Sequence, residues 1–219
     1  MTLDAANPKS EIQHPKWTAL RSPVALACFL LTMGVGLTLD LWSKSWAWRT
    51  LAVGDPWRDS TGHLRIASET STPIPGWLHF KVTVNEGAVF GLGQGNQTLF
   101  AIVSGGAILF LLYLFATSGR RWFYQIVLGM LLAGVLGNLY DRMTFRYVRD
   151  MLYIFPDKYI NWFGQPREVF PWIFNVADTL LCAGVGLMVV YSFFAQEGEG
   201  VGAPRGNEGE PTQPEPARL

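Results

Sequence analysis

The sequence predicts an all-α membrane protein with four transmembrane helices and a small extracytoplasmic β-sheet between the first two helices. Charged residues make up only 16% of the 219 residues, against about 25% in an average soluble domain. Hydrophobic residues make up 49%, and they gather in segments of about 20 residues, the length that crosses a bilayer. We place the spans at about 23–41, 98–117, 122–140 and 171–194.

The spans divide the chain into three parts. We predict a cytoplasmic N-terminal segment at 1–21, a four-helix membrane domain at 22–194, and a disordered cytoplasmic tail at 195–219, which is rich in Gly, Pro and Glu. The loop 118–121 between spans two and three is short and basic, so the positive-inside rule places it in the cytoplasm. Both termini are then cytoplasmic, and both long loops are extracytoplasmic.

The first long loop predicts the sheet. Residues 78–84 alternate strictly between apolar and polar side chains, which is typical of a half-buried strand. The glycines of 85–93 permit tight turns after this strand, and 70–75, with Ser and Pro, is expected to be a loop. The second long loop carries aromatic residues typical of the lipid headgroup level, namely Tyr153, Phe155, Trp162, Phe163, Phe170 and Trp172.

The unusual polar residues converge on one face of the membrane. With four spans, the end of span one, the first long loop, the end of span three and the start of span four all emerge on the same side. A carboxylate inside a span costs about 2.5–3.5 kcal/mol at the helix centre, so its presence indicates a functional site. The residues gathered on this face are Asp40, Lys44, Asn85, Asn138, Asp141, Arg142, Asn175 and Asp178.

Asp150 and Asp178 are the main candidates for chemistry. Asn138, Asp141 and Arg142 are spaced i, i+3, i+4 and so share one face of span three. Asn175 and Asp178 share one face of span four, and Asp150, in a polar loop, can fold back over the same rim. Two carboxylates a few ångströms apart cannot both ionise easily, so one keeps a proton at a raised pKa. Such a pair can activate water with one carboxylate and polarise a carbonyl with the other.

Four blocks of the sequence resemble the motifs of bacterial lipoprotein signal peptidase (signal peptidase II). The blocks are Leu39-Asp40-x-x-Ser43-Lys44, Asn85-x-Gly-Ala-x-Phe, Gly137-Asn138-x-x-Asp141-Arg142 with Val148-x-Asp150, and Phe174-Asn175-x-Ala177-Asp178. The resemblance runs over roughly residues 24–194. It implies a four-helix aspartyl endopeptidase of the bacterial cytoplasmic (inner) membrane, whose outer sheet cradles the substrate at the extracytoplasmic face.

By motif position, the resemblance implies that Asp150 and Asp178 are catalytic. It gives substrate-binding or supporting roles to Asn85, Asn138, Asp141, Arg142, Asn175, Asp40 and Lys44. The implied partners are membrane lipids and diacylglyceryl-modified prolipoproteins, cut just before the lipidated cysteine. The loops 57–77 and 150–174 are longer than is usual in that family.

The composition gives no reason to expect a cofactor, a metal or nucleic acid. The formal net charge is zero, whereas nucleic-acid binding requires a basic surface. The two cysteines have no CxxC partner and the three histidines are scattered, so no zinc pattern exists.

Other readings stay open at this point. A small proton- or cation-coupled carrier could use the intramembrane carboxylate as its relay, but it predicts polar residues at mid-membrane depth. An unrelated intramembrane aspartyl protease would need a Gly-x-Gly-Asp motif, which this chain lacks. Structural explanations are an ion pair ending a helix for Asp141–Arg142, a helix-surface pair for Asp40–Lys44, and interhelical hydrogen bonding for Asn138 and Asn175.

Overall fold

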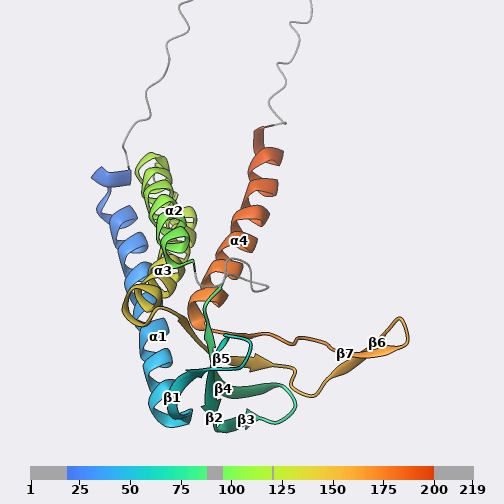
Figure 1. The fold of residues 1–219 in the computed structure, drawn as a ribbon. Coiled ribbons are helices and arrows are strands. Elements are labelled where there is room, and N and C mark those ends of the chain that lie inside the picture. Colours follow the sequence, from blue (N-terminus) through green and yellow to red (C-terminus); the bar gives the residue numbers. More distant parts are fainter. Residues whose placement is uncertain (1–18, 88–95, 120, 200–219) are drawn as a thin grey trace, which may run out of the picture.

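Four long helices form one half of the molecule and short strands form the other half (Figure 1). The structure, a computed structural model, describes residues 19–87, 96–119 and 121–199, with the backbone alone for 194–199. Each of the four helices has an apolar run long enough to cross a membrane. After a short 3-10 turn at Ala19–Arg21, the helices are α1 Pro23–Leu51, α2 Gln97–Thr117, α3 Trp122–Phe145 and α4 Val176–Glu199.

Helices α1 and α3 extend beyond their predicted spans at the end where the strands lie, whereas α4 is shorter there than predicted. Helix α1 starts after the N-cap Ser22, whose side chain accepts a hydrogen bond from the Ala25 amide. It then continues ten residues past the predicted end at 41, to Leu51. Helix α4 begins at Val176 rather than at about 171, because 173–174 pair with a strand instead. Helix α4 also runs into the first residues of the predicted tail.

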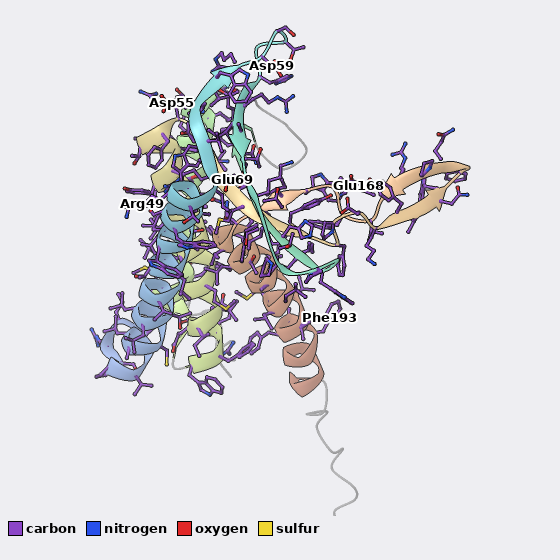
Figure 2. All side chains as sticks on the ribbon, turned by 90° about the horizontal axis from the view of Figure 1, so that it is seen from below. Arg49, Asp55, Asp59, Glu69, Glu168 and Phe193 are labelled. Carbon is purple, nitrogen blue, oxygen red and sulfur yellow. The ribbon has the colours of Figure 1, made fainter. Side chains whose placement is uncertain are left out.

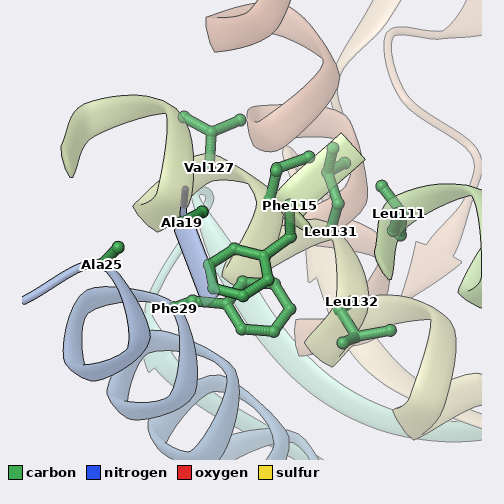
Figure 3. Packing of buried hydrophobic residues seen from close by; sticks show 9 residues of the cluster. Ala19, Ala25, Phe29, Leu111, Phe115, Val127, Leu131 and Leu132 are labelled. Atoms are coloured by element: carbon green, nitrogen blue, oxygen red, sulfur yellow. The ribbon is translucent and has the colours of Figure 1, made fainter. Parts of the chain in front are cut away.

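Helix α3 is the centre of the bundle and packs against α1, α2 and α4. Glycines permit this close approach: a Cβ at Gly129 would lie 2.7 Å from the Phe29 carbonyl oxygen, and one at Gly134 would lie 2.7 Å from that of Ala177. Figure 3 shows the apolar cluster in which α1, α2 and α3 meet. There the rings of Phe29 and Phe115 stack 4.1 Å apart.

The strands lie together at one end of the helices (Figure 1). A central antiparallel sheet has the order β3-β4-β5-β8, and β1–β2 and β6–β7 are separate hairpins. The strands are β1 Ala52–Arg58, β2 Leu64–Ser68, β3 Thr70–Ile74, β4 Leu78–Asn85, β5 Val148–Ile154, β6 Tyr159–Trp162, β7 Gln165–Glu168 and β8 Ile173–Phe174.

The all-α class predicted from the sequence is too narrow. The predicted strand at 78–84 is confirmed as β4, but the sheet also takes β5 and β8 from the second long loop. The prediction of a loop at 70–75 is wrong, because Thr70–Ile74 pairs with β4. Strand β3 is at the edge of the sheet, which is where a proline such as Pro73 is tolerated.

The two separate hairpins extend in different directions from the body of the molecule. In Figure 2 the β1–β2 hairpin, marked by Asp59, extends away from the helices, whereas the hairpin marked by Glu168 extends sideways. Several predictions fall outside the described residues: most of the N-terminal segment 1–21, most of the tail 195–219, and positions 88–95 of the glycine-rich stretch.

Candidate active site

Asp150 is held in the central sheet by two amide side chains. It lies on β5, opposite Thr83 of β4, and is only 1% exposed. Its Oδ1 accepts a hydrogen bond from Asn175 Nδ2 at 2.6 Å, and its Oδ2 accepts one from Asn85 Nδ2 at 3.2 Å. The prediction of a polar loop around Asp150 is therefore wrong, whereas the predicted return of this residue to the rim of the helices is confirmed.

Asp178 lies in the first turn of α4, where its backbone position and its side chain are both fixed. The Asn175 side chain accepts a hydrogen bond from the Asp178 amide at 2.9 Å, and Asp178 Oδ2 accepts one from the Asn175 amide at 3.3 Å. This reciprocal arrangement is a capping box. Asp178 Oδ1 accepts a further hydrogen bond from Asn138 Nδ2 at 2.7 Å. The positive end of the helix dipole favours a carboxylate at this place.

The two carboxylates are electrostatically linked. Asn175 donates to both, through its side chain to Asp150 and through its backbone to Asp178. Burial, together with the neighbouring charge of Asp178, raises the pKa of Asp150 to about 8, although the hydrogen bonds from the two asparagines oppose this rise. This rise favours the protonated form of Asp150. A carboxyl group that keeps its proton can donate it to a carbonyl oxygen.

A buried lysine connects α1 to this pair. Lys44 Nζ lies 2.8 Å from Asp40 Oδ2 and 3.5 Å from Asp141 Oδ2, and all three side chains are fully buried. Lys44 also donates to Asn138 Oδ1 at 3.0 Å. Asp40 Oδ1 in turn accepts a hydrogen bond from the Ala177 amide at 2.8 Å, which ties α1 to the start of α4. The predicted spacing of the Asp40–Lys44 pair is confirmed, but the pair is inside the protein and not on a helix surface.

Asp141 pairs with a residue that the sequence did not single out. Arg149, the neighbour of Asp150 on β5, donates to Asp141 from its Nη2 at 2.7 Å, its Nε at 3.2 Å and its backbone amide at 3.0 Å. Among the described residues Asp141 forms no ion pair with Arg142, so the predicted pairing of these two residues at the helix end is wrong. Arg142 was the adjacent residue of opposite charge, and nothing in the sequence indicated the turn that brings Arg149 back to Asp141.

Arg142 faces the end of β4. Its Nη2 donates to the Gly87 carbonyl at 3.1 Å, and its guanidinium lies 4.5 Å from the centre of the Phe100 ring. Its Nε is buried and has no hydrogen-bond partner within the described part of the chain.

Glu86, between Asn85 and Gly87, links the site to the β1–β2 hairpin. Arg58 donates to both oxygens of Glu86, at 2.7 and 3.1 Å, and the Leu64 amide donates to the same carboxylate at 3.2 Å. These contacts lower the pKa of Glu86, first of all through the hydrogen bond from Arg58. The Gly87 amide donates to Asn85 Oδ1 at 3.0 Å and so orients the amide that contacts Asp150. The sequence reading missed Arg58 and Glu86, because their pairing depends on the path of the hairpin.

All nine predicted site residues belong to one continuous network at the strand end of the bundle. Hydrogen bonds and ion pairs join them, with Gly87 linking Asn85 to Arg142. The carrier alternative predicted polar groups at mid-membrane depth, which differs from this gathering at one end. Among the described residues, no group of three or more His, Cys, Asp or Glu side chains could hold a metal ion.

Comparison with known proteins agrees with the geometry. The family model described as Signal peptidase (SPase) II matches residues 32–194. The lipoprotein signal peptidase of Rhodopirellula baltica is 32% identical over 208 residues, which cover 88% of this chain and 85% of that protein. The lipoprotein signal peptidase of Latilactobacillus sakei is 42% identical over 115 residues, which cover 52% of this chain and 68% of that protein.

Solved structures are similar in fold. A bacterial membrane enzyme determined by the in meso method at 2.3 Å resolution superposes with a TM-score of 0.58 and 26% identity, covering 82% of this chain and 93% of that one. Together with the four membrane-crossing helices, these matches define a multi-pass membrane protein. The chain belongs to the signal peptidase II family of proteases, the lipoprotein signal peptidases.

Proposed function

We propose that this chain is an aspartic endopeptidase that removes the signal peptide from diacylglyceryl-modified prolipoproteins, cutting just before the lipidated cysteine. The single observation that carries the proposal is that Asn175 donates hydrogen bonds to both Asp150 and Asp178. Family membership supplies the substrate class. We assign the catalytic roles to these two aspartates because they share this network and one of them retains its proton.

The proposed reaction uses one water molecule and one proton on the pair. Ionised Asp178 takes a proton from the water while the oxygen attacks the scissile carbonyl carbon. Protonated Asp150 gives its proton to the carbonyl oxygen, which forms a neutral tetrahedral diol. The proton on Asp178 then passes to the leaving nitrogen, and the C–N bond breaks as a diol hydroxyl returns its proton to Asp150. Each carboxylate ends as it began.

Polar side chains around the pair suit an extended peptide. The unpaired Nε of Arg142 can donate to a carbonyl next to the scissile bond. Asn85 donates a hydrogen bond to Asp150, and Asn138 donates one to Asp178. A pair held in this way needs little rearrangement during the reaction, which is where enzymes gain much of their rate.

We also propose the orientation of the chain in the bacterial inner membrane. The short basic loop 118–121 supports a cytoplasmic position for that end of the bundle and for both termini. The site then lies at the extracytoplasmic face, at the level where a diacylglyceryl anchor holds the substrate cysteine. The segment 22–194 would be the peptidase domain, with 1–21 and 195–219 as cytoplasmic extensions.

Cleavage of a defined precursor by purified variants tests the catalytic assignment. Asp150→Asn and Asp178→Asn keep the side-chain shape but cannot share an acidic proton, so each is expected to fold and to lose at least about 1,000-fold in kcat. The matched control is Asp157→Asn: Asp157 is exposed with φ at 59°, a conformation that asparagine adopts readily. Normal processing by either site variant would remove that residue from the catalytic role. Equal cleavage of unmodified precursor would refute the lipid requirement.

A further inference from the structure

The β6–β7 hairpin is an exposed ribbon with an aromatic tip. Its strands pair from Tyr159↔Glu168 to Trp162↔Gln165, and Phe163 and Gly164 form the turn with φ of 49° and 79°. Both turn residues are therefore left-handed, the combination of a type I′ turn. Asparagine or glycine is the usual occupant of such positions, and a bulky residue there is uncommon. Phe163 is 92% exposed, so burial within the protein does not explain it.

The ribbon is attached to the body mainly at its base. Strands β6 and β7 have each other as their main packing partners. At the base, the Val169 amide donates to the Lys158 carbonyl, and Tyr153 donates to Glu168 at 3.2 Å. Every residue of β6 is exposed. A two-stranded hairpin on its own is marginally stable in water at best. A surface that covers the ribbon would therefore stabilise it.

The exposed side chains have the composition of a membrane interface. In the antiparallel register Ile160 lies opposite Arg167 and Trp162 lies opposite Gln165, so these side chains share one face of the ribbon. The Trp162 and Phe163 rings meet edge to face at 5.5 Å. Tryptophan and other amphipathic aromatics are enriched at the headgroup level, and a neighbouring arginine can bind lipid phosphates.

The direction of the ribbon brings it alongside the bilayer. In Figures 1 and 2 it extends sideways from the start of α4, across the direction of the helices. The apolar run of α4 begins at Val176, so this end of the helix marks the edge of the hydrocarbon layer. A ribbon that extends sideways from this edge, across the helices, runs along the membrane surface. Only 11% of the apolar run of α4 is buried within the protein, so the ribbon starts beside a lipid-facing helix.

We propose that the β6–β7 hairpin lies on the phospholipid headgroups beside the helix bundle, with Trp162 and Phe163 inserted among them. The occupant of this surface is lipid of the same membrane, rather than the substrate or a second copy of the chain. The ribbon then holds the sheet that carries Asp150 at a fixed height above the bilayer. The proposal depends on the membrane-spanning helices and not on the catalytic roles of the aspartates.

A site-specific fluorescent label tests the proposal in the full-length protein. Both native cysteines are replaced, as Cys28→Ser and Cys182→Ala, and Phe163→Cys carries an environment-sensitive dye in nanodiscs of phosphatidylcholine and phosphatidylglycerol. The matched control is Ser60→Cys, at the exposed turn of the β1–β2 hairpin that extends away from the helices (Figure 2). We expect lipids with a quencher near the headgroup to quench the dye at 163 at least about fivefold more than the dye at 60, because contact quenching needs the dye to lie among the lipids.

Three results would overturn the proposal. The first is a dye at 163 that iodide in the water reaches as easily as it reaches the dye at 60. The second is protection of the dye only after prolipoprotein is added, which would assign the surface to the substrate. The third is protection only in discs with two copies of the chain. Cleavage activity of the same labelled protein shows that it is folded. A second variant, Phe163→Asn, removes the aromatic ring without straining the backbone, because asparagine suits the left-handed turn. With a dye at Ile160→Cys, Phe163→Asn is expected to reduce the lipid quenching.

Discussion

Replacement of Lys44 by methionine is expected to destabilise the protein strongly. The ammonium group is fully buried against Asp40 at 2.8 Å, and Asp40 is also fully buried. Asp141 keeps Arg149 as a partner when the lysine is removed, but Asp40 keeps only the Ala177 amide. Loss of one member of a buried ion pair typically costs about 3–5 kcal/mol, because the remaining charge is uncompensated. At about 2–4 °C per kcal/mol for a chain of this size, the melting temperature should fall by roughly 10 °C.

The double variant separates charge from packing. Adding Asp40→Asn to Lys44→Met removes the uncompensated carboxylate, so we expect it to restore more than half of the lost melting temperature. Cleavage should remain reduced in both variants, because Asn138 has lost the lysine that orients its amide toward Asp178. Unfolding is followed by the fluorescence of the nine tryptophans, and cleavage is measured well below the transition. The control is Lys81→Met at an exposed position of β4. A Lys44→Met protein that melts within about 2 °C of the wild type would refute the reasoning.

Three further predictions concern the pair and its supports. Because the pKa of Asp150 is about 8, its proton is present below that pH and is lost above it, so kcat/KM should fall as pH rises through 8; an unchanged rate at pH 9.5 would contradict this. Gly137→Ala should cost about 1–3 kcal/mol and most of the activity, because its Cβ would collide with the Asp40 carboxylate. Gly186→Ala, with nothing within 4 Å, should melt like the wild type. Arg58→Ala should lower kcat at least about threefold by freeing the end of β4. The control Arg65→Ala removes an equally exposed arginine, whose ion pair lies inside the β1–β2 hairpin, and should leave kcat unchanged; equal rates for the two variants would exclude the link.

The sequence predicted the helices and the gathering of polar residues because both depend on local signals. A run of apolar residues can be recognised without knowledge of the fold, and the number of spans determines which helix ends lie on the same side of the membrane. The sequence could not predict Thr70–Ile74 as a strand, because its hydrogen bonds come from β4 rather than from its own pattern. Strand β5 was missed for the same reason: it pairs with β4, more than sixty residues earlier in the chain.

Local sequence patterns also could not predict which residues form ion pairs with one another inside the site. The spacing of Asp40 and Lys44 indicates an ion pair equally well on a surface and in a core. Only the packing of α1 against α3 decides that this pair is buried and that its lysine also reaches Asn138. Arg142, next to Asp141 in the sequence, has the right charge to pair with it. The chain reverses after α3 at Arg146, whose φ is 72°, and this turn places Arg149 against Asp141 instead.

In the proposed mechanism Asp150 must hold a proton, and among the described residues no cation donates a hydrogen bond to it. Both side chains that donate to Asp150, Asn85 and Asn175, are neutral amides. Lys44 hydrogen-bonds to Asn138 rather than to either aspartate, so its charge lowers the pKa of Asp150 only from a distance, and the hydrogen bond of Arg142 goes to the Gly87 carbonyl. A cation in direct contact would favour ionisation and lower the pKa of Asp150. Amides fix the position of a carboxyl group without adding charge, so the orientation of the pair and the retention of its proton are compatible in one buried site.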